Sequence, residues 1–462
     1  MRAFPASAFA AAVTMCALCA CGGTGGPSMG PPVADPQRAA PFVQDIHPAI
    51  SSGKIKHIVI IVQENRSFDN LFMGFPGADA PKFGFDTTGK KIDLQPVGLE
   101  TTWDLDHSSS SFFEACNGTG SFPGTDCQMN GFDKEYWGCG HGGQSPCPNP
   151  DPPYSYVPRS ETQPYFTMGK EYVLADKMFA SNFDASSFIS HQYIIAGQAS
   201  SAVNYPAGLW GCDGGPNDMI DTVTQQRQIP GGQIRTCFEN ETLGDELDKA
   251  HLSWGYYTSS LNRDGALWSA YQVIKHIRYG SDWKKDIINP QTKFFGDIKH
   301  GRLRTVSWIT PTCANSDHAG CGSNHGPSWV TSLVNAVGRS KYWPSTVVFV
   351  FWDDYGGWYD DDAPSLVDYD GLGMRIPLLV ISAYSKRGYV SHVNYEHGSL
   401  LRFVEDQFGL GRLSQSDARA NSPDPDCFDF SKAPRKFVPI GSPLDQNYFM
   451  HEPMDYRVPD SE

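Results

Sequence analysis

Residues 58–69 read Ile-Val-Ile-Ile-Val-Gln-Glu-Asn-Arg-Ser-Phe-Asp, an apolar run that stops at a carboxylate and an amide. The five β-branched residues at its start predict a strand that is buried on both faces, as in a parallel sheet. Ligands of open α/β folds bind where such strands end. Because Glu64 and Asn65 at this position give up apolar packing, we expect them to serve chemistry.

A second segment has the same design. Residues 347–352 read Val-Val-Phe-Val-Phe-Trp and are followed by Asp353 and Asp354. Together with Glu64 and Asn65, these aspartates would supply hard oxygen ligands to a divalent metal ion, with Ca, Mg or Mn favoured. Such an ion can polarise a phosphoryl oxygen and lower the pKa of a nucleophile. In the alternative interpretation, Glu64 caps a helix and the aspartates accept loop hydrogen bonds, but two matching strand ends favour a metal site.

Strand and helix patterns alternate through the rest of the chain. The apolar spacing predicts strands over 172–179, 252–257, 306–310 and 376–381, and helices over 242–250, 329–337 and 399–408. This alternation predicts an α/β fold in three layers, α/β/α, in which helices cover both faces of a mostly parallel central sheet. The paired polar motifs lie at opposite ends of the body, so we expect one large domain over 51–450.

The N-terminus carries an export signal. A short apolar run follows Met1-Arg2, and it is too short to span a bilayer but suits a signal peptide over 1–20. The sequence Leu-Cys-Ala-Cys that ends at Cys21 looks like a bacterial lipobox, which would make Cys21 a lipidated residue; secretion without a lipid is the alternative. We therefore expect an exported protein, either an envelope lipoprotein or a periplasmic or secreted protein.

Composition divides the remaining chain. Residues 21–50 are rich in Gly, Pro and Ala and predict a flexible tether, whereas 451–462 are expected to form a C-terminal tail. Residues 108–160 are crowded with Gly, Pro, Ser, Asn and Cys and predict a loop-rich insertion near the active face.

Cysteine usage agrees with export. Of 12 cysteines, three fall in the leader and the others lie mainly in loops: Cys116 with Cys127, Cys139 with Cys147, Cys212 with Cys237, Cys313 with Cys321, and Cys427 alone. Closely spaced loop cysteines in an exported chain indicate disulfides, although spacing does not fix their connectivity. A zinc cluster formed by the first four is the alternative, but zinc sites prefer tighter spacing.

The charge balance restricts the partners. A formal net charge of -15 argues against a nucleic-acid partner, whose binding surface should be basic. It also disfavours electrostatic docking on anionic lipid. A zwitterionic or small anionic substrate in a local metal site remains compatible with this charge. The sequence does not determine the oligomeric state.

Three motifs carry a family resemblance. Residues 63–69 (Gln-Glu-Asn-Arg-Ser-Phe-Asp), 352–360 (Trp-Asp-Asp-Tyr-Gly-Gly-Trp-Tyr-Asp) and 395–400 (Tyr-Glu-His-Gly-Ser-Leu) resemble the bacterial phospholipase C/acid phosphatase phosphoesterase family. The resemblance extends roughly from Lys54 to Leu413. It implies an alkaline-phosphatase-like fold and a metal-assisted attack by a Ser or Thr. The chain departs from the family at 360–362, where three aspartates replace the usual segment that contains a His.

The resemblance also implies catalytic residues. Counting back from His191 selects Ser187 as the nucleophile, and Ser186 is the alternative because the family's usual Gly-Pro is missing from this loop. His107 and His318 match family histidines near the phosphate. Imidazoles at these positions would neutralise phosphoryl charge or protonate the leaving oxygen.

These features together predict a hydrolase of phosphoric esters. The expected reaction is phospholipase C-type cleavage of a phosphodiester such as phosphatidylcholine through a phosphoseryl intermediate. Acid phosphatase activity on phosphomonoesters is one alternative, and a non-catalytic, lipid-anchored binding protein is another, disfavoured by the intact ligand set. Aromatic residues in or beside the insertion are candidates for contact with a choline head group or lipid, with packing as the alternative: Trp137, Tyr154, Tyr156 and Tyr165.

Overall fold

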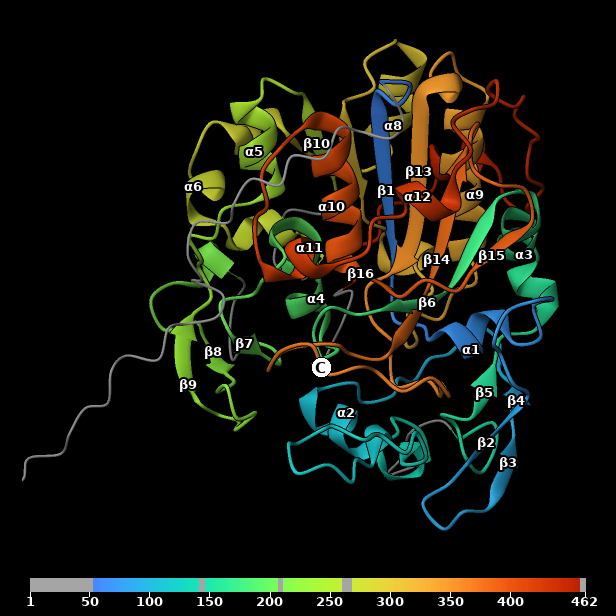
Figure 1. The fold of residues 1–462 in the computed structure, drawn as a ribbon, viewed down its shortest axis with the longest axis vertical. Coiled ribbons are helices and arrows are strands. Elements are labelled where there is room, and N and C mark those ends of the chain that lie inside the picture. Colours follow the sequence, from blue (N-terminus) through green and yellow to red (C-terminus); the bar gives the residue numbers. More distant parts are fainter. Residues whose placement is uncertain (1–52, 141–145, 207–210, 260–267, 458–462) are drawn as a thin grey trace, which may run out of the picture. The chain divides into compact units, whose positions relative to one another are not determined.

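The computed structural model describes residues 53–140, 146–206, 211–259 and 268–457, and within them a nine-stranded sheet forms the centre of the fold (Figure 1). The predicted signal peptide, Cys21 and the whole of the predicted tether lie outside the described residues. The strand order is β11 (Ile287–Ile288), β10 (Trp254–Tyr257), β12 (Val306–Ile309), β1 (His57–Gln63), β13 (Thr346–Trp352), β14 (Arg375–Ser382), β6 (Val173–Phe179) and β15 (Tyr389–Ser391), and β16 (Tyr395–Glu396) also pairs with β6.

The two strands that carry the polar motifs are neighbours. β1 runs parallel to both β12 and β13, and Gln63 is in register with Trp352. Glu64 and Asp353 therefore leave the sheet at the same level and at the same edge. β14 is antiparallel to β13 and to β6, while the other pairs of this sheet are parallel. The predicted mostly parallel sheet is confirmed.

The strands predicted from apolar runs form the buried centre of the molecule. Every residue of β13 and every residue of β1 after His57 is buried, as expected for strands covered on both sides. The strands predicted at 172–179, 252–257, 306–310 and 376–381 correspond to β6, β10, β12 and β14.

Helices cover both faces of the sheet, which confirms the three-layer prediction. One group, α3 (Arg159–Glu171), α8 (Lys293–Lys299) and α9 (Gly326–Gly338), packs together against β6 and β13. The other group consists of α4 (Ser187–Ala196), α5 (Leu243–Lys249), α10 (His397–Phe408) and α11 (Gln415–Arg419), and α10, α11 and α4 lie in front of the sheet in Figure 1. The three helices predicted from the sequence correspond to α5, α9 and α10.

Smaller elements collect at the carboxyl ends of the central strands, in the lower part of Figure 1. They are α1 (Phe68–Phe72), α2 (Ser109–Cys116), the pairs β2 (Phe83–Phe85) with β3 (Lys91–Asp93) and β4 (Gln95–Pro96) with β5 (Ser155–Tyr156), and the sheet of β7 (Ala202–Val203), β8 (Met219–Thr222) and β9 (Gly232–Arg235). The segment over 108–160 is therefore not wholly loop, because it contains α2 and β5 and ends at the start of α3.

Four disulfides hold the loops. They join Cys116 to Cys127, Cys139 to Cys147, Cys212 to Cys237 and Cys313 to Cys321. The four cysteines of the alternative zinc cluster are thus consumed in disulfides. Cys427 is a buried thiol.

The end of the chain is attached to the body. Asp455 Oδ2 accepts a hydrogen bond of 2.7 Å from the backbone N–H of Ala314, and Arg457 Nη1 donates one of 2.5 Å to the carbonyl of Cys321. Residues 451–457, expected to be a tail, therefore lie against the loop after β12. None of the helices in the described ranges has the length and apolarity that a bilayer crossing requires.

Candidate active site

Two carboxylates and an imidazole meet where β1 and β13 end. Glu64, His191 and Asp353 place one ligand atom each within 4.8 Å of one another, and all three side chains are buried. His191 Nε2 lies 3.2 Å from Glu64 Oε1 and 3.6 Å from Asp353 Oδ2. Carboxylate and imidazole groups at such spacing are suited to a divalent cation. We call this group the Glu64 cluster.

The backbone beside the Glu64 cluster is held in an uncommon conformation. Asn65 has a φ of 56°, a left-handed geometry that Asn tolerates better than most residues, and its N–H donates to Asp353 Oδ1 at 3.0 Å. Gly356 has a φ of +61°, and a Cβ on it would lie 2.3 Å from the carbonyl oxygen of Asn65. The glycine therefore lets the loop after β13 close against the loop after β1.

The other two predicted ligands lie beside the cluster and contact each other. Asn65 Nδ2 is 2.8 Å from His107 Nε2 and 3.5 Å from Asp354 Oδ2. Asp354 Oδ1 accepts a hydrogen bond of 2.7 Å from the N–H of Gly356. Thus the structure brings Glu64 and Asp353 to His191, while Asn65 and Asp354 form an adjacent layer. The predicted four-residue ligand set stays a prediction.

Ser187, the predicted nucleophile, begins α4. It lies one helical turn before His191, so the two side chains project from the same face of the helix, and His191 contacts Glu64 and Asp353. Ser187 Oγ is fully buried and has no hydrogen-bond partner in the described part of the chain. The hydroxyl of Ser186, in contrast, is hydrogen-bonded to Asp184 Oδ2 at 3.2 Å and to the carbonyl of Asn204 at 3.0 Å.

Asp184 shapes the loop that presents Ser187. Its Oδ1 accepts a hydrogen bond of 3.2 Å from the N–H of Ser186, two residues ahead, which is the typical Asx-turn arrangement. Its other oxygen accepts from the hydroxyl of Ser186 and the N–H of Asn204. Burial raises the pKa of Asp184 to about 6, although these hydrogen bonds oppose that shift. The hydrogen bonds of Asp184 therefore hold the conformation of the loop that immediately precedes α4.

The two predicted histidines lie side by side. The ring centres of His107 and His318 are 6.1 Å apart. His107 Nδ1 is 2.8 Å from the carbonyl of Leu105, so this nitrogen is the donor and Nε2 accepts from the amide of Asn65. His318 Nδ1 contacts the carbonyl of Ala319 and lies 3.6 Å from Asp104 Oδ2.

Asp317 anchors the segment that carries His318. Its N–H donates to Gln63 Oε1 at 2.9 Å, and its Oδ2 accepts from Tyr165 Oη at 2.7 Å and from Trp352 Nε1 at 3.1 Å. Burial raises the pKa of Asp317 to about 6. Because Gln63 and Trp352 end β1 and β13, the same strands position the Glu64 cluster and His318.

Some of the aromatic residues considered for lipid contact serve packing instead. Tyr165 is fully buried on Asp317, and Tyr154 is fully buried and stacks on Tyr359 with ring centres 5.0 Å apart. Neither ring is open to a choline head group. Trp137 and Tyr156 are partly buried.

Three further residues near the site lacked an assigned role in the sequence-based prediction. His191 marked only the register of Ser187, yet its spacing of four residues from Ser187 was a signal that both share a helix face. Tyr205 Oη lies 3.4 Å from both His107 Nε2 and the N–H of Ser187. His397, part of the 395–400 motif, is fully buried near Asp353 and His191, and burial lowers its pKa to about 4. Tyr205 had no sequence signal, because a loop brings it to the site.

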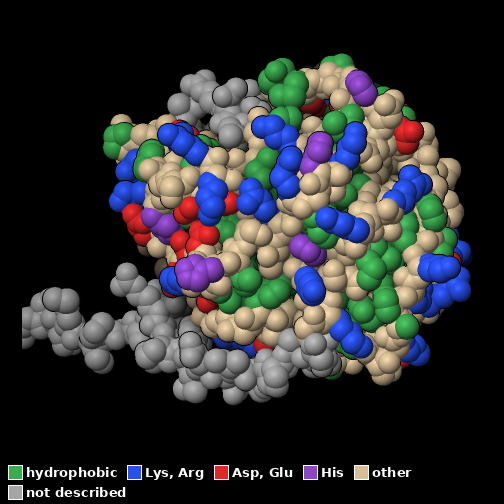
Figure 2. Space-filling view, turned by 90° about the horizontal axis from the view of Figure 1, so that it is seen from above, with side chains coloured by type: hydrophobic (Ala, Val, Ile, Leu, Met, Phe, Trp, Pro, Cys, Tyr) green, Lys and Arg blue, Asp and Glu red, His purple; other side chains and the backbone are tan. Residues whose placement is uncertain are grey.

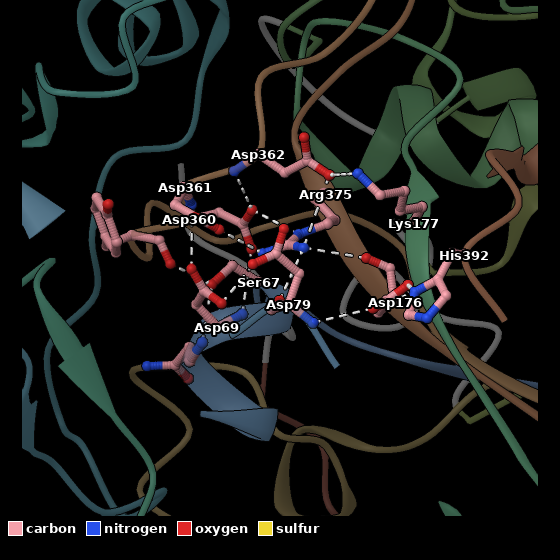
Figure 3. Close-up of polar contacts among 12 residues, drawn as sticks. Ser67, Asp69, Asp79, Asp176, Lys177, Asp360, Asp361, Asp362, Arg375 and His392 are labelled. Carbon is pink, nitrogen blue, oxygen red and sulfur yellow. Dashed lines mark hydrogen bonds and ion pairs between the residues drawn. The ribbon is translucent and has the colours of Figure 1, made fainter. Parts of the chain in front are cut away.

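The aspartates that depart from the family pattern form a second acidic cluster, shown in Figure 3. The guanidinium of Arg375 contacts Asp360 Oδ1 at 2.7 Å, Asp361 Oδ1 at 2.8 Å and Asp69 Oδ1 at 3.1 Å. Desolvation raises the pKa of Asp69 and raises that of Asp360 to about 7. We call this group the Arg375 cluster. It ties α1, β14 and the loop after β13 together.

Comparison with known proteins shows the family of this chain. The model of the Phosphoesterase family matches residues 55–411. Phospholipase C B of Mycobacterium tuberculosis is 24% identical over 407 residues, which cover 77% of this chain and 74% of the relative. Non-specific phospholipase C1 of Arabidopsis thaliana is 24% identical over 417 residues, covering 80% and 70%. Hemolytic phospholipase C of Pseudomonas aeruginosa is 24% identical over 426 residues, covering 79% of this chain but 54% of that longer protein.

Among solved structures, a protein of the alkaline phosphatase superfamily from Vibrio parahaemolyticus aligns with 83% of this chain and 76% of its own, at 11% identity and a TM-score of 0.37. The family model spans most of the folded body, including both strand ends that build the Glu64 cluster. The chain belongs to the Phosphoesterase family.

Proposed function

We propose that this phosphoric ester hydrolase cleaves phosphodiesters in the manner of a phospholipase C, with Ser187 as the nucleophile. One observation carries the proposal: Ser187 shares a helix face with His191, whose imidazole contacts the buried Glu64 and Asp353. A nucleophile is thereby aimed at a group that is able to hold a cation.

The residues present fit a divalent metal ion. Asp353 Oδ2 receives no hydrogen bond from any residue that the structure describes, and the same is true of Asn65 Oδ1. Buried carboxylates are expensive without compensation, so a cation at this position would stabilise them. Glu64, Asp353 and His191 are the candidate ligands, with the oxygens of Asn65, Asp354 and Ser187 nearby. When bound, the ion would supply positive charge to the Ser187 oxygen and to the phosphoryl oxygens.

The protein's own groups account for the remaining chemistry. Ser187 Oγ releases its proton to water and attacks phosphorus in line, a P–O bond forms, and the bond from phosphorus to the leaving oxygen breaks. The product of this step is phosphoseryl enzyme and a free alcohol. Water then attacks the same phosphorus, releases the phosphorylated head group and restores Ser187. The position of Ser187 at the first turn of α4 adds the positive end of a helix dipole.

The two histidines divide the proton and binding roles in this proposal. His107 accepts a hydrogen bond from Asn65 on Nε2, so its neutral form is suited to orienting the site. His318 has the carboxylate of Asp104 beside its Nδ1, which is suited to balancing a proton on that ring. We therefore assign protonation of the leaving oxygen to His318.

The relatives support a phosphodiester substrate. Three that match most of this chain are phospholipases C by name. For a lipid such as phosphatidylcholine, cleavage on the glycerol side of the phosphorus would give diacylglycerol and phosphocholine. The acid phosphatase alternative would accept phosphomonoesters instead.

The substrate class is tested by turnover of a chromogenic phosphocholine diester and a chromogenic phosphomonoester, each with and without a chelator. We expect rapid, chelator-sensitive turnover of the diester and slow turnover of the monoester. Preference for the monoester would favour acid phosphatase. Absence of turnover of both would indicate a binding protein.

The nucleophile is tested by the matched pair Ser187→Ala and Ser186→Ala. We expect loss of Ser187 Oγ to lower kcat by about a thousandfold or more. Loss of the Ser186 hydroxyl removes a loop hydrogen bond and should destabilise the fold by about 1 kcal/mol with little change in kcat. Acid quenching during turnover of a phosphorus-labelled substrate should leave label on Ser187 in the wild type. Near-normal turnover by Ser187→Ala would contradict the assignment.

The four disulfides indicate an oxidising compartment and so support export. We propose that the leader directs this export and that Cys21 receives a lipid. Labelling with a radioactive fatty acid should mark the wild-type protein but not Cys21→Ala. Equal labelling of both would contradict lipidation at Cys21, and absence of label on both would indicate plain secretion.

A further inference from the structure

A groove lined by basic side chains crosses the face at the amino ends of the central strands. Two adjoining cavities of about 610 and 410 Å³ share Arg339, Ser340 and Lys341. Their basic lining consists of Lys299, His300, Arg339, Lys341, Arg435 and Lys436. Neither cavity has an Asp or Glu among its lining residues. We call the two cavities together the basic groove.

Four of the six basic side chains of the groove form no ion pair within the described residues. Elsewhere basic side chains pair with carboxylates, as Arg419 does with Glu396. In contrast, Lys299, Arg339, Lys341 and Lys436 make no ion pair with a described carboxylate. In a chain with a net charge of -15, such a gathering of cations opposes the overall charge. It creates a local positive field on an acidic protein.

Two acidic residues that adjoin lining residues in the sequence, Asp297 and Asp445, are engaged elsewhere. Asp297, on α8, contacts Arg302 Nη2 at 2.9 Å and accepts a hydrogen bond of 2.9 Å from Tyr257 Oη. Asp445, next to α13 (Gln446–Phe449), accepts a hydrogen bond from the N–H of Tyr448.

Helix dipoles explain only part of this charge. α8 and α9 end at the groove, and cations are favoured at the C-terminal ends of helices. His300 Nδ1 does contact the carbonyl of Gly296, in the last turns of α8. Arg435 is likewise structural, because it donates to the carbonyls of Glu171 and Ser385. Lys436 lies on a separate loop and donates no hydrogen bond to a carbonyl of either helix within the described residues.

An exposed apolar side chain borders the same groove. Val438 is 51% exposed and lies between the lining residues Phe437 and Pro439. Figure 2 looks onto this face from above and shows Lys, Arg and His side chains among green apolar areas, with acidic residues gathered mainly toward one side. Basic groups interleaved with exposed apolar groups are typical of surfaces that lie on a lipid interface.

We propose that the basic groove docks the protein on an anionic phospholipid surface. A soluble polyanion would complement the lysines but would leave the exposed Val438 without a partner. A bilayer offers phosphate groups to the cations and an apolar interface to this side chain.

The position of the groove separates docking from catalysis. The segment Trp343–Ser345 borders the groove and leads directly into β13, whereas Asp353 follows the other end of that strand. A strand of this length spans about 20 Å. Lys56, just before β1, donates its N–H to the carbonyl of Ser345 at 2.9 Å, so the start of β1 lies beside the groove as well.

Vesicle co-sedimentation of the mature protein tests the proposal. The vesicles are phosphatidylcholine alone or phosphatidylcholine mixed with phosphatidylglycerol, in the presence of a chelator that prevents metal-dependent cleavage and cation bridging. The variant is Lys299→Glu with Lys341→Glu. The control is Lys82→Glu with Lys90→Glu, an equal charge change beside β2 and β3, at the opposite end of the molecule (Figure 1).

We expect binding to the anionic vesicles that weakens with salt, falls by about tenfold or more in the groove variant, and is nearly unchanged in the control. Both variants should turn over a soluble chromogenic ester as the wild type does, which shows that the fold and catalysis are intact. Equal binding to neutral and anionic vesicles, or equal losses in the two variants, would overturn the proposal.

Val438→Ser distinguishes a bilayer from a soluble polyanion. We expect this variant to bind anionic vesicles several-fold more weakly, while its retention on a heparin column stays at the wild-type salt concentration. If heparin binds through the groove and anionic vesicles do not, the partner is a soluble polyanion and the proposal fails.

Discussion

The Glu64 cluster and the Arg375 cluster are both buried groups of acidic side chains at the carboxyl edge of the sheet, but their charges are balanced differently. In the Arg375 cluster, one guanidinium contacts Asp69, Asp360 and Asp361 within 3.1 Å. In the Glu64 cluster, the partner of Glu64 and Asp353 is an imidazole, His191. The first cluster carries its own cation and needs no other, whereas the second is suited to receiving one.

Hydrogen bonding sharpens the same contrast. In the Arg375 cluster, Asp360 Oδ2 accepts from the N–H of Asp69, and Asp69 Oδ2 accepts from the N–H of Asp361. In the Glu64 cluster, Asp353 Oδ1 accepts from Asn65, but Asp353 Oδ2 has no donor among the described residues. A buried carboxylate oxygen that receives no hydrogen bond from the described residues is suited to a metal ion, whereas carboxylates whose oxygens all accept hydrogen bonds or ion pairs serve the scaffold.

The largest expected effect comes from removing the internal cation. Arg375→Met leaves Asp69 and Asp360 buried without compensation, so we expect the free energy of unfolding to fall by about 3–5 kcal/mol. Urea unfolding measures it. Lys177→Met is the control, because the pair of Lys177 with Asp362 is partly exposed and its loss should lower the stability by less than about 1 kcal/mol. Equal decreases in the free energy of unfolding of the two variants would contradict a structural role for the Arg375 cluster.

Next comes a change in the Glu64 cluster. Asp353→Asn should lower kcat/KM by about a hundredfold to a thousandfold, because the site loses a charge that holds the metal ion. Unfolding in chelator should show a free energy within about 1 kcal/mol of the wild type, since one buried negative charge disappears. Steady-state turnover and urea unfolding supply the two values. A large loss of stability with normal turnover would reverse the roles of the clusters.

A smaller effect is expected from pH. Burial raises the pKa of Asp360 to about 7, well above its unfolded value, so the folded state holds a proton that the unfolded state releases. Stability from this group is present below about pH 4 and is lost as the pH rises through about 7. We expect Asp360→Asn to flatten the stability profile between these values by roughly 2 kcal/mol. Urea unfolding across this range measures it, and an identical slope in both proteins would rule out Asp360 as the titrating group.

Much of the fold follows from local sequence. The apolar runs at 58–62 and 347–352 become β1 and β13 because such β-branched and aromatic residues need burial on both faces. Their shared register then places Glu64 beside Asp353. The antiparallel direction of β14 does not follow, because residues 376–381 are apolar in either direction and only the long connection from β13 sets it.

The site is only partly predictable for a similar reason. Glu64, Asp353, Ser187 and both histidines are marked by their motifs. The side chain of Asn65 contacts His107 because its backbone has a positive φ. The amino-acid composition does not predict this backbone conformation. Tyr205 reaches the site from a distant loop, so its approach to Ser187 is a purely tertiary contact.

Metal binding distinguishes the Glu64 cluster from the Arg375 cluster most directly. It is measured by calorimetric titration of Ca, Mg and Mn into chelator-treated wild type, Asp353→Asn and Asp360→Asn. The account predicts one ion per chain in the wild type, the same binding in Asp360→Asn, and binding that is lost or at least about tenfold weaker in Asp353→Asn. Retention of the ion by Asp353→Asn together with its loss from Asp360→Asn would contradict the assignment of the Glu64 cluster as the metal centre.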